Sequence, residues 1–133
     1  MSSTYAIHIQ HPHGNIGITT SAGASKNQWG NLEIDVLFMS IGLLSRIDKD
    51  EREDYFNHVQ PKNHEGLVIV PIHWDTFMKK LDLNMGLQKI PSFVDDVDET
   101  INYSKEESAK KGVNVHAMNL MEQIHLFQNT VSH

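Results

Sequence analysis

The sequence predicts an α+β domain, in which an N-terminal β-hairpin and one central strand form a small sheet of about three strands, covered by four or five helices. Three observations support this class. Residues 4–10 and 16–18 alternate apolar and polar positions, residues 67–72 form a short β-branched run, and much of the remainder has apolar residues at helical spacing. We expect one globular domain, 1–133, because 133 residues is an ordinary length for one domain.

The predicted hairpin has its turn at residues 11–15, the sequence His-Pro-His-Gly-Asn. Its register follows from the side-chain alternation, because a shift of one residue would divide the isoleucines between the two faces of the sheet. The register that keeps them together pairs Ile7 with Ile18 and Ile9 with Ile16. The same register places His8 on the opposite face, near Gly17.

The central strand is predicted at residues 67–72, Leu-Val-Ile-Val-Pro-Ile, because no other short run in the chain is so continuously apolar and β-branched. The turn-prone residues 63–66 precede it. His73, Trp74 and Asp75 follow it and resemble the first turn of a helix. Open sheets often carry functional groups at this position, so the end of the strand is a candidate site.

The most apolar helical stretch begins at Leu32 and ends at Ile47. It is apolar on nearly every side, so we expect it to be buried either in the core of the domain or across a homodimer. Its small residues Ser40, Gly42 and Ser45 would allow two copies of the helix to approach closely in such a dimer.

Four further stretches have helical patterns. Residues 48–59 combine a charged run, where we expect a turn, with a short amphipathic helix that ends near Val59. Residues 74–81 carry an apolar face, residues 92–112 are acidic at the start and basic at the end, and residues 117–131 carry a C-terminal apolar stripe. In the third stretch Ser92 is a possible cap, and Gly112 is placed to end the helix.

Composition excludes several classes of protein. The chain has no cysteine, which removes disulfides, thiolate metal sites and cysteine nucleophiles. Its seventeen acids against eleven lysines and arginines give a net charge of −6, which disfavours a nucleic-acid partner. No apolar segment reaches the ~20 residues of a membrane span, and the first residues do not resemble a secretory signal, so we expect a cytoplasmic protein without a membrane partner.

The nine histidines are the unusual feature of the composition. His11 and His13 could approach one metal ion with His8 as a third ligand, but no standard metal motif completes the set. We therefore predict no metal site and no cofactor. A histidine-dependent hydrolase or nuclease is the alternative function; it would use His73 with Asp75, and His8 or His58.

Two acidic clusters favour a different function. A small acidic domain with such patches is suited to dock onto a basic protein, because complementary charge accelerates association. We therefore expect a non-enzymatic binding or inhibitory protein, of the immunity-protein, antitoxin or anti-defence type. The residues predicted to contact the partner are Asp48, Asp50, Glu51, Glu53, Asp54, Asp95, Asp96, Asp98 and Glu99.

Overall fold

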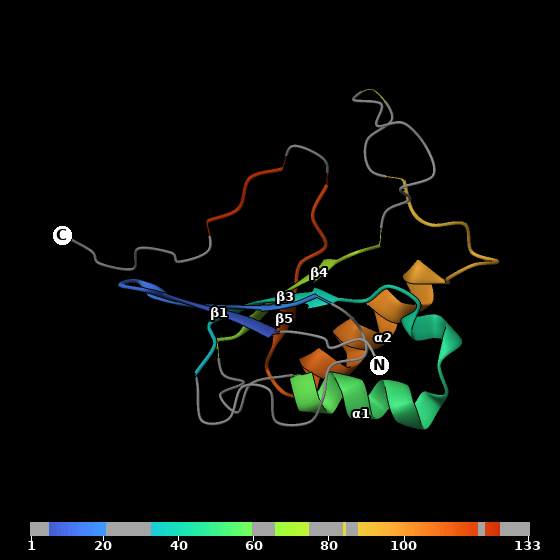
Figure 1. Ribbon diagram of the computed structural model, residues 1–133, viewed down its shortest axis with the longest axis horizontal. Helices are drawn as coiled ribbons and strands as arrows, with labels where there is room; N and C mark the ends of the chain where they lie inside the picture. The colour runs from blue at the N-terminus through green and yellow to red at the C-terminus, as the bar shows by residue number, and fades with distance from the viewer. Residues whose placement is uncertain are drawn as a thin grey trace.

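The described residues of the protein form a five-stranded mixed sheet, with two α-helices packed against one side (Figure 1). The computed structural model describes residues 6–20, 33–59, 66–74, 84, 88–119 and 122–125. Its elements are β1 (Ala6–His11), β2 (Gly14–Thr19), β3 (Val36–Ser40), the 3₁₀-helix η1 (Leu44–Arg46), α1 (Lys49–Val59), β4 (Val68–Ile72), α2 (Val97–Ala109) and β5 (Asn114–Val115). The expected sheet of about three strands under four or five helices is therefore wrong.

The strands follow one another across the sheet in the order β1-β2-β3-β4-β5. The hairpin partners β1 and β2 are antiparallel, and every later pair is parallel. Because α1 and α2 connect successive parallel strands in one direction across the sheet, right-handed connections place both helices on the same face. We call this the helix face of the sheet.

The long helix expected between Leu32 and Ile47 does not form. Its centre is β3, which lies between β2 and β4 and is buried at four of its five positions, and η1 follows after a turn. A parallel strand buried on both sides is apolar at nearly every position, so its sequence lacks the alternation that identifies an exposed strand. The helix that the homodimer prediction relied on is therefore absent.

The hairpin register is confirmed. Ile7 pairs with Ile18, Ile9 with Ile16, and His8 with Gly17. Because paired residues point to the same face, the isoleucines extend across the sheet into Phe38 and Val70 of the next strands. This apolar face is opposite the helix face, and on it Ile7 and Ile9 remain 45% and 44% exposed.

The strand predicted at residues 67–72 is confirmed as β4, although it contains a proline. Its predicted place at the centre of the sheet is wrong, because β3 is the middle strand and β4 lies beside it. Pro71 lies opposite Met39 of β3, whereas β5 pairs only with Val68 and Ile69. Proline lacks the amide hydrogen that a neighbouring strand would accept, so it is tolerated where the ladder on one side has ended. Its carbonyl is used, since the Trp74 indole Nε1 donates to Pro71 O at 3.1 Å.

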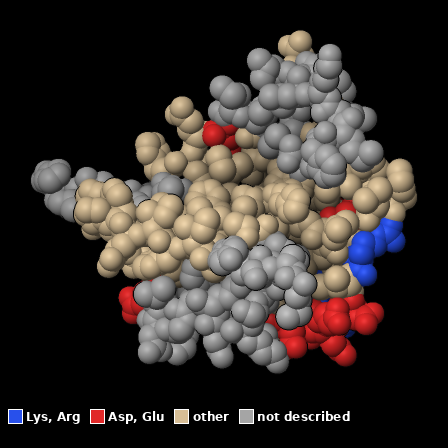
Figure 2. Space-filling view, viewed as in Figure 1, with Lys and Arg blue, Asp and Glu red and all other residues tan. Residues whose placement is uncertain are grey.

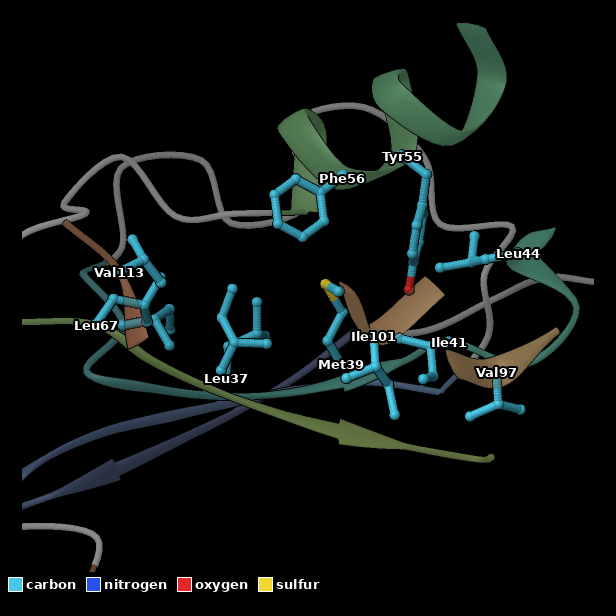
Figure 3. Packing of buried hydrophobic residues seen from close by; sticks show 12 residues of the cluster. Leu37, Met39, Ile41, Leu44, Tyr55, Phe56, Leu67, Val97, Ile101 and Val113 are labelled. Carbon is cyan, nitrogen blue, oxygen red and sulfur yellow. The ribbon is translucent and has the colours of Figure 1, made fainter. Parts of the chain in front are cut away.

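The core lies between the sheet and the two helices (Figure 3). Leu37 and Met39 of β3 and Ile69 of β4 point to the helix face, where they meet Phe56 of α1 and Ile101 of α2, all nine-tenths or more buried. Each such side chain contributes about 1.5–3 kcal/mol when fully buried. These contacts fix the positions of α1 and α2 beneath the strands.

The helical predictions had mixed outcomes. The short helix expected to end near Val59 is confirmed as α1, but it begins at Lys49, inside the charged run where a turn was expected. The helix expected at 92–112 is α2, whose N-cap is Asp96 rather than Ser92. Gly112 follows α2 with φ 71°, as its predicted role requires. The helix expected at 117–131 is wrong for 117–119 and 122–125, which are irregular.

The remaining helical prediction, residues 74–81, falls almost entirely outside the described residues. Within the part of the chain that the structure describes, no helix has the length and apolar character needed to cross a membrane.

Candidate functional site

The carboxyl ends of β2, β3 and β4 bring three polar residues to one edge of the sheet. Thr19 ends β2, Ser40 ends β3, and His73 follows β4. Parallel strands in register place such residues side by side, and open α/β sheets bind ligands at this edge. Of the three, only His73 was predicted as a site residue. Ser40 could be identified as a hydroxyl at the end of a strand only once residues 36–40 are recognised as that strand.

Tyr55 of α1 locks this edge from the helix face. Its hydroxyl donates to Ser40 O at 2.7 Å and lies 3.2 Å from Thr19 Oγ1, which in turn accepts from Ser40 N at 3.0 Å. Since the Tyr55 proton is given to Ser40, the Thr19 hydroxyl donates to the Tyr55 oxygen. Burial raises the pKa of Tyr55 to about 12, so it stays neutral and has a structural role.

On the opposite face, Ser40 orients the imidazole of His73. Ser40 Oγ lies 3.2 Å from His73 Nδ1. Ser40 is fully buried, whereas His73 is exposed and has φ 62°. Left-handed backbone in a non-glycine residue is costly, and it is often found at functional sites. Gly42 allows the His73 imidazole to lie close to the backbone of the loop after β3, because a Cβ at Gly42 would lie 3.0 Å from His73 Nδ1.

A cavity of about 220 Å³ opens beside His73. Its walls come from the apolar face at the ends of β3 and β4, from the residues after β4, and from the C-terminal segment. The lining residues are Phe38, Val70, Pro71, Ile72, His73, Trp74 and Met118. Among these described residues, His73 is the one titratable group, so the lining that they form is apolar with a single titratable anchor.

Asp95 holds the loop after β3 in place. It is fully buried, its Oδ2 accepts from Leu43 N at 2.7 Å, and its Oδ1 accepts from Ser45 Oγ at 2.5 Å. Leu43 is the second non-glycine residue with positive φ, at 64°. The prediction that Asp95 belongs to an exposed partner-binding surface is therefore wrong, because its carboxylate is used inside the protein.

The other predicted acidic residues are exposed and lie on two neighbouring elements. Figure 2 shows acidic side chains gathered at the lower right, where α1 lies in the same view. The two sequence clusters are connected by an ion pair between Arg52 and Glu99, 2.9 Å apart. We define the acidic surface as Asp48, Asp50, Glu51, Glu53, Asp54, Asp96, Asp98 and Glu99, all exposed.

The predicted catalytic set does not come together in the described residues. His8 is in β1, on the helix face, and β2 and β3 separate it from β4, so it lies on the order of 14 Å from that strand across the sheet. Asp75 and the side chain of His58 lie outside the described residues. Ser40 is too deeply buried to attack a substrate, so its contact with His73 serves to orient the imidazole.

The histidines of the hairpin turn do not form a metal site with other described residues. His13 N donates to His11 Nδ1 at 3.1 Å, and the two rings are 5.4 Å apart. Among the residues that the structure describes, no group of three or more histidine or carboxylate side chains could hold a metal ion.

In comparisons with known proteins, no family model, curated protein or solved structure matches the chain.

Proposed function

We propose that the protein is a non-enzymatic binding protein whose acidic surface covers a basic surface of a protein partner, in the manner of an immunity protein, antitoxin or anti-defence inhibitor. The supporting observation is that two acidic clusters far apart in the sequence adjoin through α1 and the first turn of α2. A continuous field of one sign steers a partner of opposite charge and suppresses wrong partners. The absence of cysteine is consistent with action in the cytoplasm.

The cations near this surface support the proposal because they leave most of its charge available. Arg52 pairs with Glu99 and lies 4.7 Å from the centre of the Tyr103 ring, and its side chain is only 12% exposed. Lys89 Nζ lies 2.6 Å from Asp98. These pairs use two of the eight carboxylates of the acidic surface, whereas Asp50 and Asp54 are exposed on α1. A partner's lysines and arginines would meet the remaining negative charge.

The test compares two double charge reversals of equal size. Asp50→Lys with Asp54→Lys changes the acidic surface, and Glu33→Lys with Glu106→Lys changes exposed positions outside it. Each protein is used as bait in a lysate of the native host, at several salt concentrations. We expect wild type and the Glu33/Glu106 variant to retain the same basic protein in stoichiometric amount, with retention weakening as salt rises.

The Asp50/Asp54 variant should lose that protein while keeping the circular dichroism of the wild type. Equal recovery by both variants, or a captured partner that is acidic, would rule out the acidic surface as the binding site.

A further inference from the structure

We propose that the cavity beside His73 is a binding site for a small aromatic carboxylate. The proposal is independent of the acidic surface, because the cavity walls belong to the apolar face of the sheet and α1 lies on the helix face. At about 220 Å³ the space accommodates a single aromatic ring with a short side chain. Its position at the carboxyl ends of β3 and β4 is where open sheets place ligands.

The tautomer of His73 determines which polar group of a ligand it can bind. The Ser40 hydroxyl is buried, and His73 Nδ1 is within hydrogen-bonding distance, so we assign the hydroxyl as donor and Nδ1 as acceptor. A neutral imidazole that accepts at Nδ1 carries its hydrogen on Nε2. His73 therefore offers a donor, which a carboxylate satisfies more strongly than a neutral oxygen does.

The cavity walls determine which apolar group of a ligand fits best. Phe38 and Trp74 provide aromatic surface, and Met118 provides a polarisable thioether, which makes favourable contacts with ring edges. The Trp74 indole is held by its bond to Pro71 O, so its orientation is set before a ligand arrives. A preordered aromatic wall favours a planar ligand, because fewer side chains must be immobilised on binding.

The test titrates ¹⁵N-labelled full-length protein with three probes: 3-phenylpropionate, 3-phenylpropanol and hexanoate. We expect 3-phenylpropionate to shift the amides of the cavity walls, Phe38 and Trp74 included, and to saturate at millimolar concentration. The alcohol should bind about tenfold more weakly, because it lacks the charge that strengthens the hydrogen bond to His73. Hexanoate should also bind more weakly, because it cannot stack on the aromatic walls.

Three variants locate the binding. His73→Asn removes the imidazole but keeps a residue that tolerates positive φ, so it should fold and lose about tenfold in affinity for 3-phenylpropionate. His13→Asn, at an exposed position of the hairpin, is the matched control and should bind as wild type does. Met118→Trp fills the cavity and should abolish binding of all three probes.

Several results would overturn the assignment. They are the absence of saturable shifts with 3-phenylpropionate, shifts confined to residues away from the cavity, unchanged affinity in His73→Asn, or an equal affinity for hexanoate. Backbone spectra of each variant without ligand separate a loss of binding from a loss of the fold.

Discussion

Replacing Asp95 with alanine should lower the free energy of unfolding by about 3–5 kcal/mol. The carboxylate accepts two short hydrogen bonds inside the protein, from Leu43 N and Ser45 Oγ. Hydrogen bonds to a charged group are each worth roughly 1.5–3 kcal/mol, and alanine would leave a partly buried amide without its acceptor. Since small domains are stable by only about 5–15 kcal/mol, the loss should be large relative to the whole.

The conservative variant Asp95→Asn keeps the shape of the side chain but can accept through only one oxygen. Its oxygen can still accept from Leu43 N, and its NH₂ group would face the Ser45 hydroxyl, which would have to accept instead of donate. Because the charge that strengthens both hydrogen bonds is also lost, we expect about half of the alanine effect. Asp98→Ala is the control, because Asp98 is 66% exposed and its ion pair with Lys89 is a surface pair worth at most about 1 kcal/mol.

Urea unfolding followed by circular dichroism measures all three variants against wild type. The assignment of Asp95 as an internal clamp requires it to be far more sensitive than Asp98. If Asp95→Ala and Asp98→Ala lowered the free energy of unfolding equally, the Asp95 carboxylate would behave as a surface charge, and its hydrogen bonds to Leu43 and Ser45 would not stabilise the fold.

Further predictions concern the strand ends and the end of α2. Tyr55→Phe should cost about 1 kcal/mol in urea unfolding, through the lost bond to Ser40 O. The pKa of Tyr55 is near 10 in the unfolded chain and about 12 in the folded protein, so the wild type should lose stability between pH 10 and 12. The loss should reach up to about 1.4 kcal/mol per pH unit. Tyr55→Phe should lack this contribution, because it has no hydroxyl to ionise. Gly42→Ala should cost about 1–3 kcal/mol in the same assay, because its Cβ would lie 3.0 Å from both His73 Nδ1 and His73 O; an unchanged midpoint would contradict that contact. Gly112→Ala has space for its Cβ but has φ 71°, so only about 1–2 kcal/mol of backbone strain should appear in thermal unfolding.

The parts of the fold that were predicted correctly are those with a local signal. The hairpin register followed from the positions of four isoleucines, because a one-residue shift would have divided them between the two faces of the sheet. The end of α2 followed from Gly112, which adopts the left-handed conformation that glycine accepts most easily. Both features depend on neighbouring residues, so a sequence pattern can indicate them without knowledge of the tertiary structure.

The parts that were wrong depend on which elements pack together. The run around β3 is apolar on both faces, because β2 and β4 flank it and the core covers it, and a buried helix would have a similar composition. Asp95 shows the same limit for a charged residue. Its neighbours in sequence are exposed acids, and only the loop containing Leu43 and Ser45, about fifty residues away, makes it internal.

The candidate site could be predicted only in part for the same reason. His73 was identifiable because it follows a strand, but the serine that orients it belongs to β3, a strand whose sequence pattern predicts a helix. The acidic surface was the opposite case. Its members were visible in the sequence, and the structure added that Arg52 and Glu99 bring the two clusters together.

The direction in which the chain crosses the sheet connects these features. Successive parallel strands are added on one side, so the right-handed connections place α1 and α2 on one face of the sheet. That face therefore carries the acidic surface, whose charged residues all lie on or next to these helices. The opposite face has no helix among the described residues, and there Ile7 and Ile9 stay partly exposed and the cavity beside His73 is open. A basic protein and a small ligand would thus occupy opposite sides of the sheet, so a variant that removes one binding activity should leave the other intact.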